Sequence, residues 1–436
     1  MFLGPLFFLV YEICNWLTSL RPDVPTAYFD WERAIPFVPA MIVPYMSTDL
    51  FFAGSFFLCR DSRELRTLGL RFLSAILLSA AGFLLFPLRF AFERPEVDGI
   101  YGALFRLLGS FDRPYNQAPS LHLSLLVLQW MVYARHTNGV LRTGLYAWSV
   151  LIGLSTVLTY QHHVLDLYTG VAVAIVSYYL FPERAVATSG VGTWPSVPVR
   201  RHWRLVGAYA MGAALCATAA GLDWRITHPF LWPAAALGLV AAAYAGLGTA
   251  IFLKSSGRLS LASRLVLAPH LLGAYVSFRL YTHRQAPYSE VAPGLLLGRK
   301  LSASEARHVV AEGVVAVVDL TAEFSETASL RSLKYLNLQV LDLTVPSPSQ
   351  LRVAADFMLQ HRRLGKVLVH CALGYGRSAA VVAAYLLASG EARTVAEAVT
   401  RVRHAQPRAV FSSAVLAMLE AFQKNLRPMD RVVAGR

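Results

Sequence analysis

The chain has 436 residues, of which 56% are hydrophobic and only 15% are charged. This balance excludes an ordinary soluble protein of the same length and indicates segments that cross a membrane. The formal net charge of +14 comes with no nucleic-acid-binding motif. We therefore interpret the basic residues as charges that orient membrane segments, and we expect no nucleic acid partner.

Four cysteines are present, and three of them lie in or beside apolar segments at irregular spacing. These three are Cys14, Cys59 and Cys216, and the fourth is Cys371. Such spacing predicts neither a disulfide framework nor a zinc site. We expect no metal and no other cofactor.

Apolar runs of about twenty residues, the length that crosses a bilayer, recur through the first 255 positions. They predict an all-α, polytopic membrane domain at 1–181 with six spans. Two further spans and an interfacial linker are expected at 182–284. The predicted spans are 2–19, 37–58, 68–86, 117–134, 143–160, 164–181, 204–221 and 229–253. The start of the chain lacks a basic region and a small-residue cleavage site, so we expect the first span to be retained.

The distribution of lysine and arginine orients these spans. More basic residues fall in the set of loops that holds Arg60, Arg135 and Lys254 than in the alternate set, which holds Arg94. Because loops rich in basic residues stay in the cytoplasm, we expect both termini there. The predicted location is a bacterial-type cell (inner) membrane, crossed several times.

Three pieces of the membrane region carry polar residues that a plain anchor does not need. Arg94-Pro95 follows the third span, Pro119-Ser120-Leu121-His122 opens the fourth, and a polar run ending in His162 and Asp166 joins the fifth and sixth. By the charge distribution, all three pieces face the non-cytoplasmic side. His162 and Asp166 are four residues apart, so on a helix the carboxylate can fix the imidazole tautomer.

These pieces resemble the motifs of the type-2 phosphatidic acid phosphatase superfamily, especially its branch of inositol phosphorylceramide synthase-like proteins. The resemblance implies that His162 is the nucleophile of a phosphohistidine intermediate and that Asp166 orients it. It implies that His122 protonates the leaving alcohol. It also implies that Arg94 and Ser120 hold the phosphate.

The sequence departs from the superfamily pattern at three positions. Leu121 replaces a glycine, which the synthase-like branch tolerates. Pro87 and Thr156 stand where the pattern has basic residues. The absence of these two basic residues has two interpretations: the site has lost its activity, or it holds its substrate differently. His163 is interpreted as a residue of the helix start without a catalytic role.

The segment 260–281 is apolar, but Arg264, Pro269, His270 and Arg279 interrupt it. Such a segment is expected to lie in the cytoplasmic membrane interface and not to form a ninth span.

From Glu290 the pattern changes to that of an α/β domain, which we predict at 285–425 with a tail at 426–436. Strand-like runs occupy 295–298, 314–320 and 367–370, and a further strand is expected from Tyr335 towards Asp342. Helix-like runs occupy 303–312, 350–363, 377–389 and 395–405. The alternation predicts a central mixed sheet flanked by helices.

The run around Cys371 holds the strongest chemical signal in the chain. A strand ends at His370, a loop containing Gly374 and Gly376 follows, and a helix opens at Arg377. Backbone N–H groups of such a loop converge on an anion at the helix N-terminus. The same field favours a thiolate, and an arginine can hold two phosphoryl oxygens at once.

His370-Cys371-(five residues)-Arg377-Ser378 resembles the signature of the cysteine-dependent dual-specificity phosphatases within the protein tyrosine phosphatase superfamily. The resemblance implies that Cys371 is the nucleophile, that the loop binds phosphate and that Ser378 stabilises the departing thiolate. It also implies a general acid about thirty residues before the cysteine. Asp342 fits that place, and Asp319, at the end of an earlier strand, is the alternative.

The two resemblances together predict an integral membrane phosphatase that hydrolyses phosphate monoesters through a cysteinyl-phosphate intermediate in its cytoplasmic domain. Members of the resembled superfamily that act on polyphosphorylated inositides carry lysines in this loop, whereas the loop at 372–376 carries no charge. The resemblance therefore implies a substrate with a single phosphate. The membrane tether favours a phospholipid headgroup, and the resemblance suggests phosphatidylglycerophosphate, the substrate class of a related mitochondrial lipid phosphatase. The alternatives are a membrane-anchored protein tyrosine or serine phosphatase with an inert membrane half, a lipid phosphotransferase, and a phosphate sensor without turnover.

Overall fold

A computed structural model describes residues 3–110, 112–183, 201–222 and 228–426 of the chain. The chain folds as two compact units, Met1–Arg184 and Ala185–Arg436. The finer boundaries expected at 181, 284 and 425 stay predictions. Apart from its first residue, the expected tail at 426–436 lies outside the described residues.

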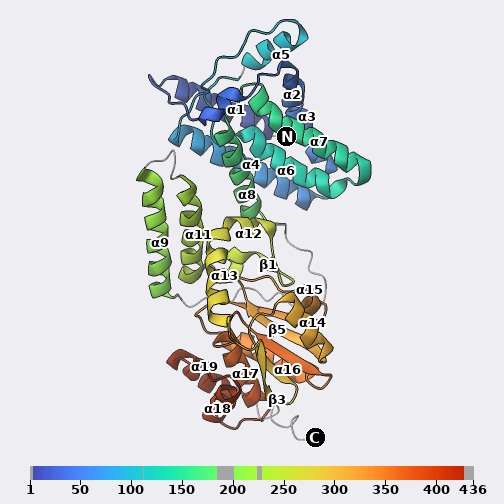
Figure 1. Cartoon of the computed structure of the whole chain (residues 1–436), viewed down its shortest axis with the longest axis vertical. Coiled ribbons are helices and arrows are strands. Elements are labelled where there is room, and N and C mark those ends of the chain that lie inside the picture. Colours follow the sequence, from blue (N-terminus) through green and yellow to red (C-terminus); the bar gives the residue numbers. More distant parts are fainter. Residues whose placement is uncertain (1–2, 111, 184–200, 223–227, 427–436) are drawn as a thin grey trace. The chain divides into compact units, whose positions relative to one another are not determined.

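The first unit is helical throughout its described elements (Figure 1). Its core lies between α1, α4, α6 and α8, where Phe72, Phe83 and Leu128 are buried. The helices are α1 (Leu3–Ser19), η1 (Asp30–Ala34), η2 (Pro39–Met41), α2 (Ile42–Met46), α3 (Thr48–Leu58), α4 (Ser62–Leu85), α5 (Gly99–Gly109), α6 (Leu121–His136), α7 (Gly139–Leu158) and α8 (Val164–Leu180).

Five helical segments of the described residues are long and apolar enough to cross a membrane, and each coincides with a predicted span. They are Pro39–Leu58, Ser62–Leu85, Gly139–Leu158, Trp203–Leu222 and Leu231–Phe252. The other three predicted spans correspond to α1, α6 and α8, which are 17, 16 and 17 residues long. The helix α5 lies in a region that was predicted as a loop.

The second unit begins with α9 (Trp203–Leu222) and α11 (Leu231–Ala242), which lie side by side (Figure 1). The segment expected in the membrane interface forms two helices, with a break at Leu267 and Pro269 in the first turn of the second. The remaining elements before the sheet are η3 (His228–Phe230), η4 (Ala243–Leu247), η5 (Gly248–Phe252), β1 (Lys254–Ser255), β2 (Arg258–Leu259), α12 (Leu261–Val266) and α13 (Ala268–Thr282).

The rest of the second unit is built on a five-stranded sheet in the order β3-β4-β7-β5-β6. Strand β3 pairs antiparallel with β4, and the other neighbours are parallel, so the predicted mixed sheet is confirmed. Strand β3 lies at the edge of the sheet and was not predicted. The bounds are β3 (Tyr288–Ala292), β4 (Leu295–Gly298), β5 (Val314–Thr321), β6 (Lys334–Val340) and β7 (Lys366–His370).

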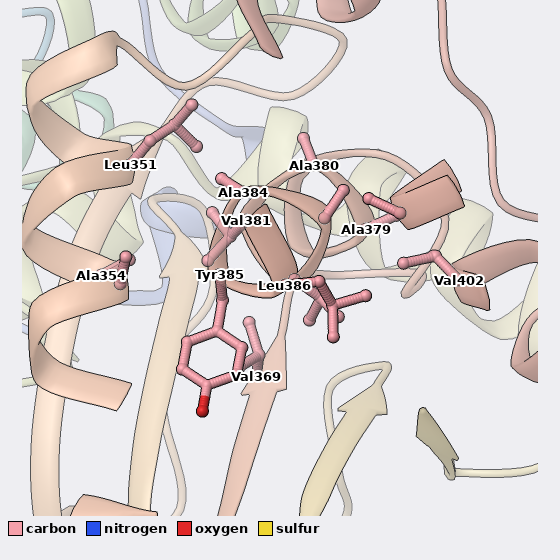
Figure 2. Close-up of a cluster of buried hydrophobic side chains, with 14 of the residues drawn as sticks. Leu351, Ala354, Val369, Ala379, Ala380, Val381, Ala384, Tyr385, Leu386 and Val402 are labelled. Carbon is pink, nitrogen blue, oxygen red and sulfur yellow. The ribbon is translucent and has the colours of Figure 1, made fainter. Parts of the chain in front are cut away.

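Helix α17 (Arg377–Ala388) lies at the centre of this α/β domain, and every one of its residues is buried. Figure 2 shows its Val381, Ala384 and Tyr385 beside Leu351 of α16 and Val369 of β7. A helix that is apolar on all sides is stable only inside a core, so its N-terminus is firmly placed. The other helices are α14 (Ala303–Ala311), α15 (Ala328–Arg331), α16 (Pro348–His361), α18 (Val395–Ala405) and α19 (Ser413–Lys424); of these, α15 and α19 were not predicted.

Candidate active site

The loop between β7 and α17 wraps around the sulfur of Cys371. The Sγ atom accepts hydrogen bonds from the backbone N–H of Gly374 at 3.2 Å and from the Ser378 hydroxyl at 3.3 Å. Gly374 has φ +80°, and a Cβ added there would lie 2.9 Å from the carbonyl oxygen of Gly298. Only glycine fits this turn. Gly376 follows as the N-cap of α17, so the structure brings these predicted residues together.

The environment of Cys371 favours its thiolate. Burial alone would raise the pKa of the thiol, but the charge of Arg377 and the hydrogen bonds from Ser378 and Gly374 lower the pKa below its usual value. A lowered pKa suits a nucleophile, because the thiolate and not the thiol attacks phosphorus.

The guanidinium of Arg377 is buried and held in a fixed orientation. Its Nη1 and Nη2 atoms donate to the carboxylate of Glu323 at 3.1 and 2.7 Å, and Nη1 also donates to the Val340 carbonyl at 2.8 Å. The bidentate partner in this structure is therefore Glu323, which was not predicted from the sequence. A fixed guanidinium beside the thiolate is preorganised to stabilise charge on a phosphoryl group.

The two candidate acids occupy different environments. Asp342 lies in the loop after β6, its side chain is 57% exposed, and its Oδ1 is 3.0 Å from Arg377 Nη2. Asp319 is completely buried in β5. Burial alone would raise the pKa of Asp319, but the charge of Lys254 lowers it well below its usual value. A general acid must reach the substrate's leaving group, which the completely buried Asp319 does not, so the exposed position of Asp342 beside Arg377 favours Asp342, whose role remains a prediction.

In the first unit the residues predicted to form a second phosphate site also lie near one another. His162 Nδ1 is 3.4 Å from Asp166 Oδ2, and the ring centroids of His122 and His162 are 5.8 Å apart. The Ser120 hydroxyl accepts the N–H of Leu123 at 3.4 Å as the N-cap of α6.

Two further contacts surround this group. Arg94 donates through Nη2 to the carbonyl of Tyr160 at 3.4 Å, and its guanidinium lies over the Phe105 ring. His163 is buried in a contact that the sequence did not indicate, with Nδ1 3.0 Å from a carboxylate oxygen of Glu32. The structure therefore groups His162, Asp166 and His122, while their chemical roles stay predictions.

The second unit also matches known proteins. The family described as "Dual specificity phosphatase, catalytic domain" matches residues 295–425. Human phosphatidylglycerophosphatase and protein-tyrosine phosphatase 1 is 32% identical over 139 residues, which are 29% of this chain and 68% of that protein. The chain belongs to the dual specificity phosphatase family.

Two further relatives are named for different activities. Phosphatidylglycerophosphate phosphatase PTPMT2 of Arabidopsis thaliana is 28% identical over 174 residues, 38% of this chain and 75% of that protein. Human dual specificity protein phosphatase 26 is 36% identical over 138 residues, 28% of this chain and 63% of that protein. The predicted enzyme class is confirmed, and this dual specificity phosphatase is a phosphoric monoester hydrolase. The family match concerns the α/β domain alone.

Three buried charged residues of the phosphatase domain were not predicted from the sequence, because each works through a partner far away in the chain. Besides Glu323, they are Glu326, whose Oε2 is 3.0 Å from His370 Nε2, and Lys254, whose Nζ donates to Asp319 at 2.7 Å. For the two glutamates the sequence offered one signal, because Glu323 and Glu326 follow directly after a strand that is predicted to be buried.

Asp319, Glu326 and His370 also present potential metal-ligand atoms within 4.8 Å of one another. The ammonium group of Lys254 already supplies a positive charge at Asp319, so the donor set fits an internal ion-pair network better than a metal ion.

Proposed function

We propose that this dual specificity phosphatase is an integral membrane enzyme that removes phosphate from a phospholipid headgroup. One observation carries the proposal: α13 packs against the loop that orients Arg377, with the rings of Phe278 and Phe324 at 5.8 Å. The same helix leaves a set of large apolar side chains exposed, and an exposed apolar surface of this kind fits a membrane interface. The set is Leu272, Tyr275, Val276, Leu280 and Tyr281.

The loop chemistry supports a substrate with one phosphate. The residues at 372–376 are uncharged, so Arg377 is the cation that the loop region offers to the substrate. Two of the three relatives described above carry phosphatidylglycerophosphate hydrolysis in their names, although the human one of these is also named a protein-tyrosine phosphatase, and the third is named as a protein phosphatase. A lipid headgroup monoester fits the apolar surface of α13, which a soluble phosphoprotein does not need.

The reaction proceeds in two displacements at phosphorus. The Cys371 thiolate attacks, the P–O bond to the headgroup breaks, and Asp342 gives its proton to the leaving alkoxide. Water then attacks the cysteinyl-phosphate, Asp342 takes a proton from that water, and the thiolate leaves with a hydrogen bond from Ser378. Arg377 stabilises the charge on the phosphoryl oxygens in both transition states.

We also propose a second lipid-phosphate site in the first unit, at His162, Asp166 and His122. Its support is the His162–Asp166 contact at 3.4 Å and a hollow lined by residues that include His122, Tyr45 and Asp112. Such a site either hydrolyses a lipid phosphate or transfers its headgroup to another alcohol.

Substrate preference tests the proposal directly. Full-length protein in mixed micelles is offered phosphatidylglycerophosphate, phosphatidic acid and a phosphotyrosine peptide, and phosphate release is measured. We expect kcat/KM for phosphatidylglycerophosphate to exceed that for the peptide at least about tenfold, because the tether raises the effective concentration of lipid at the site. Faster turnover of the peptide than of either lipid would instead establish a membrane-anchored protein phosphatase.

Topology provides a separate prediction. A reporter fused after Lys254 or at Arg436 is expected to read as cytoplasmic, and one inserted near Asp98 as periplasmic, because the loops with more basic residues stay inside. An external C-terminus would contradict the proposed orientation, since Cys371 would then face an oxidising compartment.

A further inference from the structure

The loop that carries Asp342 is held from outside the phosphatase domain. The hydroxyl of Tyr244, in the kinked end of the α11 segment, donates to the backbone carbonyl of Asp342 at 3.0 Å. These two residues are 98 positions apart in the chain. On the other side of the loop, Arg377 donates to the carbonyl of Val340. The acid loop is thus fixed at two carbonyl groups, and one of the donors belongs to the apolar helical segment.

This loop needs such support because its backbone is strained. Leu343, directly after Asp342, has φ +56°, the left-handed region that a branched side chain rarely adopts. A residue held there persists only where its surroundings define the conformation. The strained turn projects the Asp342 carboxylate to Arg377, and the Tyr244 hydrogen bond stabilises the backbone of that turn.

Tyr244 is itself fixed by three elements of the helical segment. Its buried ring stacks on Tyr209 of α9, with centroids 5.5 Å apart and an interplanar angle of 10°. Tyr209 in turn meets His270 of α13 edge-on at 5.7 Å, and the Tyr244 carbonyl accepts the N–H of His202. A positive φ of 140° at Gly246 makes the kink that ends the helix beside this ring. The hydroxyl therefore has little freedom to move away from the acid loop.

We infer that Tyr244 is a positioning residue for acid catalysis, through which the membrane-associated helices hold the general-acid loop of the phosphatase in its working conformation. The inference rests on the proposed function, because it assumes that Asp342 is the acid. It adds that the helical segment contributes to the rate of the chemical step and is more than an anchor.

The test compares substrates that need an acid to different degrees. Hexyl phosphate has a poor leaving group that requires protonation, whereas p-nitrophenyl phosphate scarcely requires it. Full-length Tyr244→Phe keeps the stacked ring and loses only the hydroxyl. We expect it to lower the ratio of kcat/KM for hexyl phosphate to that for p-nitrophenyl phosphate roughly three- to tenfold, the size of one hydrogen bond.

Tyr209→Phe is the matched control. It lies in the same ring stack, and within the described part of the chain its hydroxyl makes no hydrogen bond to the acid loop. We expect this variant to leave the substrate ratio within about twofold of wild type, as is usual for a change that touches no such contact.

Asp342→Asn separates this inference from the proposed function. Alone, it is expected to lower kcat/KM for hexyl phosphate roughly 10²- to 10⁴-fold and kcat/KM for p-nitrophenyl phosphate much less, because kcat/KM reports the first displacement, in which the leaving group is protonated. In that background, Tyr244→Phe is expected to leave the ratio unchanged, because the acid that it positions is gone.

Three outcomes would overturn the inference. If Asp342→Asn behaves as expected and Tyr244→Phe leaves the ratio at the wild-type value, Tyr244 does not position the acid. If Tyr244→Phe lowers kcat/KM for both substrates by the same factor, whether or not Asp342 is present, the hydroxyl supports only the fold. If Asp342→Asn lowers kcat/KM for both substrates by the same factor, Asp342 is not the acid. The assignment in the proposed function then fails together with the inference.

Discussion

Replacing Cys371 with serine is expected to abolish the phosphatase activity of the α/β domain, with kcat for an aryl phosphate falling roughly 10⁴- to 10⁶-fold. The serine hydroxyl stays protonated in a site that stabilises a thiolate, so the nucleophile is lost. The loop keeps its glycines, Arg377 and Ser378, so the variant should still bind phosphate or vanadate. Turnover of p-nitrophenyl phosphate and vanadate binding on the same preparation check both halves of this expectation.

His162→Ala is the partner variant in this experiment. His162 belongs to the first compact unit and Cys371 to the second, so the histidine variant should leave aryl phosphate hydrolysis at the wild-type level. Any activity on short-chain lipid phosphates that arises from the first unit should vanish in His162→Ala and survive in Cys371→Ser. A headgroup passed to an added alcohol, instead of to water, would identify that activity as phosphotransfer.

Two results would change this assignment. If Cys371→Ser removes every activity and His162→Ala removes none, the first unit has no catalytic site, in agreement with the replacements at Pro87 and Thr156. If His162→Ala stops aryl phosphate hydrolysis in well-folded protein, the two sites are not independent.

Lys254→Met is expected to destabilise the second unit by about 3–5 kcal/mol, because it leaves a buried carboxylate without its counter-charge. The side chains of Lys254 and Asp319 are fully buried, and Lys254 Nζ also donates to the carbonyl and hydroxyl of Thr321 at 2.7 and 3.0 Å. Thermal unfolding of full-length protein in detergent should show a fall in Tm of roughly 10 °C for the transition of this unit.

Two further variants control this measurement. Asp319→Asn combined with Lys254→Met removes the unpaired charge and should recover part of the lost Tm. Lys424→Met changes an exposed lysine at the end of α19 and should shift Tm by about a degree or less. A Lys254→Met shift no larger than that of Lys424→Met would show that the buried pair contributes nothing to stability.

Much of the catalytic loop could be predicted from sequence because its determinants are contiguous. Cys371, the loop glycines and Ser378 lie within eight positions, and their geometry follows from local rules: a strand end, a turn that only glycine fits and a helix N-terminus. The central strands and α17 were equally accessible, since continuous apolar runs indicate full burial. The edge strand β3, the short helix α15 and the helix α19 were missed.

What the sequence by itself determined is thus the chemistry of this protein: a cysteine thiolate, an arginine and a phosphate-sized loop that follow a set of apolar helices in the chain. Only the tertiary structure decided which distant charges tune that chemistry. Glu323 meets Arg377 across 54 positions, Lys254 meets Asp319 across 65, and Tyr244 meets Asp342 across 98. A lone glutamate, lysine or tyrosine has no local pattern that names its partner. Such pairs form because a buried charge or hydroxyl is costly until a partner satisfies it, and the fold alone determines which partner is within reach.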